Sequence, residues 1–407
     1  MNSKFTAILL TFLLLVISIT GCSSEVDIET TYDLGKIDSS VTRGNADFAI
    51  DIFKTLNDED LNDNIFISPL SISTALSMTY NGALGQTKED MAKTLHYSEI
   101  KLDVLNTTYR NLIDYLEQAD KEVDLLISNS IWYREGDAVK EDFLNTNRAF
   151  YDAEVRDVDF SDEQTVHTIN NWISDSTKGK IKKMLEPPIS SDVVMYLINA
   201  VYFKGEWTNK FDDSNTFATD FTNIDNEKEN VEMMRRHGEV DYALGTDYKA
   251  VKLPYGQEKM TMYVIIPEED IDINTFIQGF TLEKLDTIKE NMTAIDDVNL
   301  QIPKFKLEYG IKNLNASLSS LGMANAFGPS ANFDNIRNNI FISRVLHKAV
   351  IEVNEEGSEA AAVTVVEMKE SAVEEPIQFI ANRPFLFLIN DESTDTILFL
   401  GKYCKVD

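Results

Sequence analysis

The sequence has little cysteine: two residues in 407, Cys22 and Cys404, which lie in very different sequence contexts. A disulfide framework is therefore excluded as the source of stability. Positive charge is also scarce, because 37 lysines and arginines stand against 68 aspartates and glutamates, giving a net charge of −31. Phosphate backbones are bound by basic surfaces, so we expect no nucleic-acid partner.

Motifs that carry chemistry are missing as well. The four histidines, His96, His167, His237 and His347, form no HExxH spacing, and the chain has no GxSxG elbow, P-loop, GxGxxG or CxxC. The acidic cluster from Asp58 to Asp63 lacks the glycine and the final glutamate of an EF-hand loop, so we interpret it as a solvated turn. We expect no cofactor, no metal and no enzyme activity. A hydrolase whose triad is assembled only by the fold is kept as an alternative.

Hydrophobic residues make up 43% and aromatic residues 10% of the chain, which are values of a packed globular protein. No linker rich in proline, glycine or serine interrupts the chain after Asn45, and no repeat is visible. The sequence therefore predicts one domain over residues 45–407, large enough to bury a substantial core.

The first segment is apolar but short. Lys4 precedes the uncharged run Phe5 to Ile19, which is shorter than the roughly 20 residues that span a bilayer. This pattern predicts a secretory signal over residues 1–21. The ending, Ile19 to Cys22, resembles a bacterial lipobox, so we expect acylated Cys22 as the mature N-terminus and residues 22–44 as a polar tether. An ordinary cleaved signal remains the alternative. The expected location is the cell envelope, on the outer or extracellular side.

Helix and strand signals alternate without regular βαβ order. Helical spacing follows Pro69 up to Gly82, and occurs again over 106–118 and 166–176. Strand signals occur over 193–203, 260–266, 385–389 and 397–400. The predicted fold class is α+β.

The segment from Gly357 to Ala372 has the pattern of a half-buried strand. Alternate positions from Ser358 to Met368 are uncharged, whereas Glu359, Glu367 and Lys369 fall on the other face. The uncharged face begins with small residues and becomes bulky only later, as a strand that enters a gap would require. The pattern alone is equally consistent with an ordinary sheet strand.

Five blocks of the sequence resemble the serpin family. They are Asn64 to Ser71, Asn81 to Thr87, Asn199 with Phe203 to Trp207, His347 to Ala362, and Asn382 to Phe387 with Leu398 to Lys402. They occur in the family's order and cover about 45–402. The resemblance implies helices packed around a large central mixed β-sheet and two smaller sheets, with an exposed reactive loop at about 357–376.

The resemblance also implies a mechanism. Serpins inhibit serine endopeptidases as covalent suicide substrates: the cut loop inserts into the central sheet while the protease is still acyl-linked to it. The matching hinge residues are Glu355, Gly357, Ser358, Glu359, Ala360, Ala361 and Ala362. The family's usual hinge length places the reactive bond between Ser371 and Ala372, with Glu370-Ser371 as the alternative and Lys369-Glu370, which a trypsin-like protease would cut, as the third.

Further positions match the family's shutter and breach, which control opening of the sheet; they are Ser68, Ser71, Asn199, His347, Trp207 and Lys304. Lys304 matches the lysine that pairs with the hinge glutamate Glu355. The expected targets are elastase-like or subtilisin-like serine proteases, with papain-like cysteine proteases as further targets. We also expect contact with the membrane through lipid on Cys22. The protein itself is expected to be a monomer. A non-inhibitory serpin acting as a binding or storage protein is the alternative function.

Overall fold

The computed structural model describes residues 31–358 and 375–406. The chain divides into two units, Met1–Thr31 and Tyr32–Asp407, and all described helices and strands belong to the second. Among these residues no helix is both long enough and apolar enough to cross a membrane.

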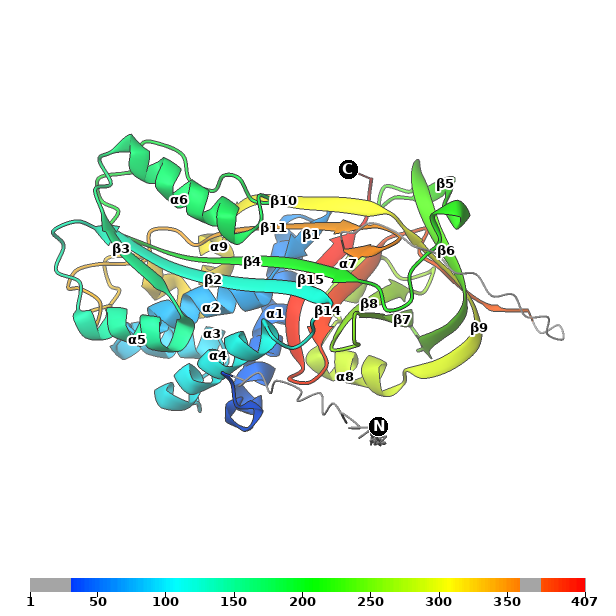
Figure 1. The fold of residues 1–407 in the computed structure, drawn as a ribbon, viewed down its shortest axis with the longest axis horizontal. Coiled ribbons are helices and arrows are strands. Elements are labelled where there is room, and N and C mark those ends of the chain that lie inside the picture. Colours follow the sequence, from blue (N-terminus) through cyan, green and yellow to red (C-terminus); the bar gives the residue numbers. More distant parts are fainter. Residues whose placement is uncertain (1–30, 359–374, 407) are drawn as a thin grey trace, which may run out of the picture. The chain divides into compact units, whose positions relative to one another are not determined.

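The second unit contains helices and strands in mixed order (Figure 1). The described α-helices are α1 (Ser39–Glu59), α2 (Pro69–Tyr80), α3 (Gly85–Thr94), α4 (Leu102–Leu116), α5 (Glu141–Tyr151), α6 (Glu163–Ser176), α7 (Ile273–Gln278), α8 (Leu282–Glu290) and α9 (Asn315–Leu318). The α+β prediction is confirmed.

The folded unit begins earlier than the predicted boundary at Asn45. Helix α1 starts at Ser39, where the carboxylate of Asp38 accepts a hydrogen bond from the backbone N–H of Ser40 at 2.9 Å. Val41 is fully buried in the core. Residues 32–44 therefore belong to the folded unit and not to the tether; their polar composition concealed a capped, amphipathic helix start.

In the described part of the chain, the largest sheet has nine strands. Along its path the order is β1 (Ile65–Ile67), β15 (Thr396–Tyr403), β14 (Phe385–Asp391), β8 (Met260–Pro267), β7 (Tyr248–Tyr255), β6 (Lys228–Leu244), β9 (Thr293–Pro303) and β13 (Ile377–Ile380), with β5 (Phe217–Thr222) paired to β6. Strands β8, β14 and β15 are buried throughout. Phe66 stacks on Phe387 and Phe399, so this sheet forms the centre of the core.

Two smaller groups of strands complete the fold. One has the order β12 (Gly357–Ser358), β4 (Met195–Glu206), β2 (Val123–Arg134) and β3 (Glu154–Val158), and the other pairs β10 (Phe305–Asn313) with β11 (Leu346–Val353). Strands β4 and β11 run side by side in Figure 1. Helix α6 packs on β2 and β4, and α2 packs on β4 and β15. The four-stranded group thus lies between two helical layers.

Candidate functional site

Strand β12 is the start of the expected reactive loop, and it already lies against the sheet. Gly357 pairs with Glu206 and Ser358 with Gly205, in antiparallel register, at the end of β4. A bridge between Asn354 and Gly357 turns the chain directly from β11 into β12. The hinge therefore sits at the entrance of the space between β4 and β11.

Only glycine fits at position 357. Its φ of +143° is in the region that disfavours side chains, and a Cβ there would overlap the carbonyl oxygen of Gly205. This close approach is what lets the chain reverse and pair with β4 within a few residues.

Ser358 is buried, with 3% of its surface exposed. Its Oγ lies 3.0 Å from the hydroxyl of Tyr255, which is itself buried, and burial raises the pKa of Tyr255. Tyr255 in turn stacks on Trp207, with ring centroids 4.4 Å apart. Ser358, the first uncharged position of the loop, is thus paired with β4 and has a hydrogen-bond partner for its hydroxyl before any cut is made.

Polar contacts from Trp207 and Lys210 hold the residues before Gly357. The indole Nε1 of Trp207 donates to the carbonyl of Asn354 at 2.9 Å, and the backbone N–H of Trp207 donates to the carbonyl of Glu356 at 2.8 Å. Lys210 lies 2.8 Å from the carboxylate of Glu356 and 2.6 Å from that of Glu206. The hinge is therefore fixed at its base while β12 enters the sheet.

Glu355 and Lys304, which the family resemblance pairs, are in contact. The Nζ of Lys304 lies 3.0 Å from one carboxylate oxygen of Glu355, and the hydroxyl of Thr216 donates to the other at 2.7 Å. Burial opposes ionisation of Glu355, but these partners outweigh it and hold the pKa of Glu355 below its usual value. Glu355 is therefore a carboxylate at neutral pH.

Ser68, Ser71 and His347 meet at the other end of β11. The backbone N–H of Ser68 donates to Nε2 of His347 at 3.1 Å, and the Ser68 hydroxyl donates to the carbonyl of Leu398 at 2.8 Å. The backbone N–H of Ser71 donates to the Ser68 hydroxyl at 3.3 Å, which caps α2 behind Pro69. Burial lowers the pKa of His347 to about 4, so the ring is neutral and can accept this bond.

Asn199 lies on β4 in the same region. Its amide nitrogen donates to the side-chain oxygen of Asn129 at 2.7 Å, and Asn129 donates to the carbonyl of Tyr151 at 2.7 Å. The side-chain oxygen of Asn199 is buried and accepts no hydrogen bond within the described residues. A buried acceptor without a donor is unfavourable, so this position favours a state that brings a donor to it.

The seam between β4 and β11 is unpaired. No ladder joins the two strands within ranges 31–358 and 375–406. Two cavities lie along the seam. A cavity of about 30 Å³ borders Val201 to Phe203, Val350 to Glu352 and Ser358, and one of about 150 Å³ borders the beginnings of both strands. Among the described residues, only β12 pairs with β4 on the side that faces the seam, and β11 has no strand partner on that side.

Several predicted residues fall outside the described part of the chain. They are Cys22, Glu359, Ala360, Ala361, Ala362, Glu370, Ser371 and Ala372. The described part brings Ser68, Ser71 and His347 together at one end of the seam and Glu355, Lys304 and Trp207 together at the other. Within it, no group of three or more potential metal ligands occurs.

Sequence reasoning missed four residues of this site: Tyr255, Thr216, Lys210 and Asn129. Each meets its partner through a contact between residues that are 70 or more positions apart. Lys210 alone left a local signal, because it follows Glu206 at a spacing of four.

The fold and the arrangement around β12 are those of a family whose members are generally protease inhibitors rather than enzymes. The Serpin (serine protease inhibitor) family matches residues 43–406. The chain belongs to the serpin family.

Individual comparisons agree with this assignment. An uncharacterized serpin-like protein of Methanosarcina acetivorans is 33% identical, over 95% of each chain. The leukocyte elastase inhibitor of Xenopus laevis is 35% identical, over 88% of this chain and 97% of its own. The crystal structure of the thermophilic serpin tengpin in the native state matches with a TM-score of 0.81 and 34% identity, covering 91% of this chain and 95% of tengpin. The predicted serpin fold is confirmed.

Proposed function

We propose that this protein is a covalent suicide-substrate inhibitor of serine endopeptidases. A target protease cuts the reactive loop and becomes acyl-linked to it; the loop then enters the seam between β4 and β11 as a new strand and distorts the protease. The unpaired seam with β12 at its entrance carries this proposal. The leukocyte elastase inhibitor among the relatives supports serine proteases as targets.

The register of β12 supports a specific place for the rest of the loop. Because Ser358 faces Gly205, each further residue faces one residue earlier in β4, and Thr364 falls opposite Asn199. The bridge from Asn354 to Gly357, continued along β11, brings the same threonine opposite His347. Its hydroxyl can then donate to the buried side-chain oxygen of Asn199, which accepts no hydrogen bond from the described residues.

The gain in free energy is large enough to trap a protease. A strand of about fourteen residues that forms ladder bonds on both edges, at roughly 0.5 to 1.5 kcal/mol each, gains on the order of 10 kcal/mol. This is comparable with the total stability of an ordinary domain, about 5 to 15 kcal/mol. Deacylation by a distorted active site would then be slow.

The reactive bond that we propose is Ser371-Ala372, with Glu370-Ser371 as the alternative. A small, uncharged residue before the cut fits elastase-like and subtilisin-like proteases, whereas a cut after Glu370 fits a glutamate-specific protease. Papain-like cysteine proteases remain further candidates, because they also form acyl-enzymes.

The test is to mix the protein with pancreatic elastase or subtilisin and examine the products on denaturing gels. An inhibitor gives an SDS-stable complex in stoichiometric amounts and abolishes protease activity. A non-inhibitory serpin, the alternative function, would be cut without forming a complex. Continued turnover of a substrate by this protein alone would instead indicate a hydrolase. Either outcome would reject the proposal.

The proposed location is the outer face of a bacterial membrane, held by lipid on Cys22. The lipobox-like sequence before Cys22 supports this anchor. Cys22→Ala should leave the leader uncut or release the protein into the soluble fraction. Unchanged membrane fractionation of this variant would contradict the anchor.

A further inference from the structure

A single ammonium group joins the hinge to the strand that it enters. The Nζ of Lys210 lies 2.8 Å from a carboxylate oxygen of Glu356 and 2.6 Å from one of Glu206. Glu356 directly precedes Gly357, and Gly357 is the cross-strand partner of Glu206. Hydrogen bonds to Glu206 and Glu356 raise the pKa of Lys210, so it is charged at neutral pH. Lys210 therefore binds both sides of the first residue pair that joins β12 to β4.

The backbone around Lys210 is itself bound to the hinge. The N–H of Trp207 donates to the carbonyl of Glu356 at 2.8 Å, and the N–H of Phe211 donates to the carbonyl of Glu355 at 2.9 Å. Lys210 lies between these two donors along the chain, so its backbone is held at the base of the hinge. The side chain of Glu356 is only 12% exposed, and solvent screens such a pair less than one in open water.

This ion bridge is separate from the pair that the family resemblance implies. Lys304 binds the carboxylate of Glu355, the neighbouring residue. Within the described part of the chain, Lys210 is the lysine or arginine that pairs with Glu356. Without it, the carboxylates of Glu206 and Glu356 would lie close together with no cation between them. Like charges that meet on paired strands are destabilising, so loss of Lys210 would push β12 away from β4.

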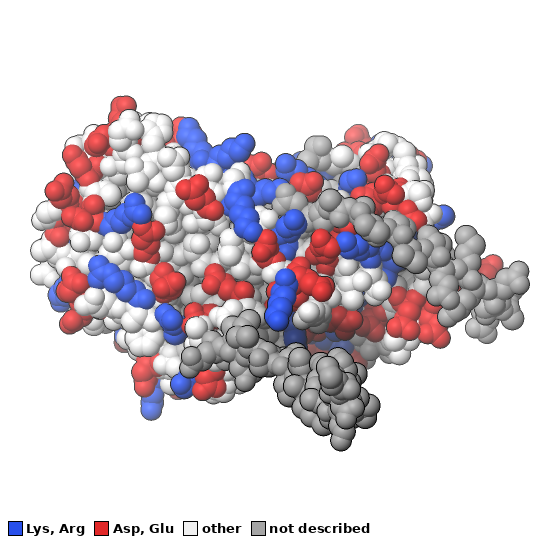
Figure 2. All heavy atoms as spheres, viewed as in Figure 1, with Lys and Arg blue, Asp and Glu red and all other residues white. Residues whose placement is uncertain are grey.

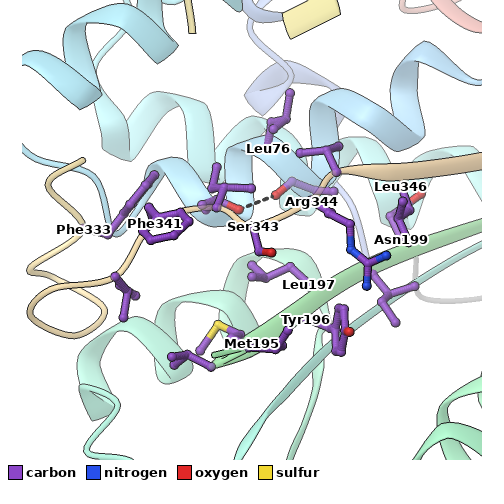
Figure 3. Close-up of a pocket in the computed structure, with 18 of the residues that line it drawn as sticks. Leu76, Met195, Tyr196, Leu197, Asn199, Phe333, Phe341, Ser343, Arg344 and Leu346 are labelled. Atoms are coloured by element: carbon purple, nitrogen blue, oxygen red, sulfur yellow. Dashed lines mark hydrogen bonds between the residues drawn. The ribbon is translucent and has the colours of Figure 1, made fainter. Parts of the chain in front are cut away.

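The two cavities of the seam indicate which end resists an entering strand. The cavity beside Ser358 has a volume of about 30 Å³, whereas the cavity of about 150 Å³ lies at the far end, between the beginning of β4 and the segment 339–347 (Figure 3). A strand that extends β12 therefore has least room at its start and most room at its end. The first steps next to Ser358 are the ones that a well-seated β12 can assist.

We propose that Lys210 is a positioning residue for loop insertion: by binding Glu206 and Glu356 together, it keeps β12 seated in the sheet. This inference rests on the proposed function. With β12 seated, the cut loop extends an existing strand and does not have to start a new one, so the entropy of ordering the first residue pairs is lost before the protease cuts. Insertion then competes better with hydrolysis of the acyl bond.

The test counts the inhibitor molecules that each molecule of elastase or subtilisin consumes. The excess over one equals the ratio of the deacylation rate to the insertion rate, and it does not depend on how fast the protease binds. We expect this excess to rise about fivefold in Lys210→Met, which is about 1 kcal/mol at 1.4 kcal/mol per factor of ten, as for a partly exposed ion pair. Lys228→Met, which removes a lysine paired with Asp220 between β5 and β6, should leave the excess unchanged. The same excess in Lys210→Met as in the parent would overturn the proposal.

A charge exchange separates the ion bridge from the packing of the lysine side chain. Lys210→Glu brings three carboxylates together and should raise the excess at least as much as Lys210→Met. Combining Lys210→Glu with Glu356→Lys again places one lysine among two carboxylates, with Glu206 as the second. This double variant should return the excess to within about twofold of the parent, because opposite charges meet again. A double variant as deficient as Lys210→Glu alone would refute positioning by charge.

Hydrogen exchange of the uncut protein tests the seating of β12 without any protease. Backbone amides of the peptide 354–358 should exchange about fivefold faster in Lys210→Met than in the parent, and no faster in Lys228→Met. Unchanged exchange in Lys210→Met would refute the role of this lysine in holding the hinge. If the parent traps no protease at all, the proposed function fails, whereas faster exchange in Lys210→Met would still show that the ion bridge keeps β12 in the sheet.

Discussion

Ser358→Arg should convert the inhibitor into a substrate. Ser358 is almost completely buried beside Tyr255, so an arginine at this position must either lie buried or keep β12 out of the sheet. Burying a charge without a partner costs several kcal/mol, about 3 to 5 when estimated from broken buried ion pairs. If the transition state of insertion bears this cost, insertion slows by about two to three and a half orders of magnitude, because each 1.4 kcal/mol is tenfold.

The assay compares the fraction of inhibitor that ends as SDS-stable complex with the fraction that ends as cleaved protein. Ser358→Thr is the matched control: it keeps the hydroxyl, and the cavity of about 30 Å³ beside Ser358 offers room for the methyl group. Glu359→Arg, on the opposite face by alternation, should also retain most inhibition. Covalent complexes of Ser358→Arg at the parent's stoichiometry would refute insertion through this hinge.

Three further predictions test the seam and the loop. Thr364→Val should lower the melting temperature of the cleaved protein but not of the uncut protein, because the donor to Asn199 is lost only after insertion; an equal change in both forms would contradict the register. Burial in the folded protein lowers the pKa of His347 from an ordinary 6.5 to about 4. Between these pH values the unfolded state binds more protons than the folded state. The free energy of unfolding should therefore fall by about 3 kcal/mol as the pH drops from 6.5 to 4. His347→Gln should remove most of that slope in urea titrations at several pH values, and an unchanged slope would assign it to other groups. Mass spectrometry of the small C-terminal fragment should find Ala372 as its new N-terminus; Ser371 would instead identify the alternative bond.

Much of the fold could be predicted because it depends on local pattern. Pro69 after a capping serine begins α2, and the alternation of β4 and the apolar runs of β8, β14 and β15 mark strands directly in the sequence. The start of the folded unit was predicted too late, because the segment before Asn45 is mostly polar and the burial of Val41 depends on contacts of α1 with helices far along the chain. The local sequence pattern thus predicted the positions of helices and strands better than the start of the folded unit.

The site was predictable only in part, for the same physical reason. The pattern of small, uncharged residues from Ser358 onward indicated which face of the loop is buried, and Ser358 itself is buried in the described structure. The family resemblance paired Glu355 with Lys304, which are in contact. Tyr255, however, is 103 positions from Ser358, and nothing in either local sequence indicates that their hydroxyls meet. Contacts between residues so far apart in the sequence arise from the topology of the sheets.

The surface charge has a consequence for the search for targets. Acidic side chains are spread over the face shown in Figure 2, with lysines and arginines among them. A protein of net charge −31 attracts cationic proteases at low ionic strength and loses that attraction as salt is added. Association rates with candidate proteases should therefore be compared at physiological salt, so that steering is not mistaken for recognition of the loop.

Hydrogen exchange measures directly whether the cut loop inserts between β4 and β11. Cleavage of the loop by a protease should bring strong new protection to backbone amides of β4 (Met195–Glu206) and β11 (Leu346–Val353), because a strand inserted between them pairs with the facing edge of each. Strands β14 and β15, already paired on both sides or buried in the core, serve as the internal reference and should not change. Cleaved protein whose β4 and β11 amides exchange as fast as those of the uncut protein would contradict insertion at this seam.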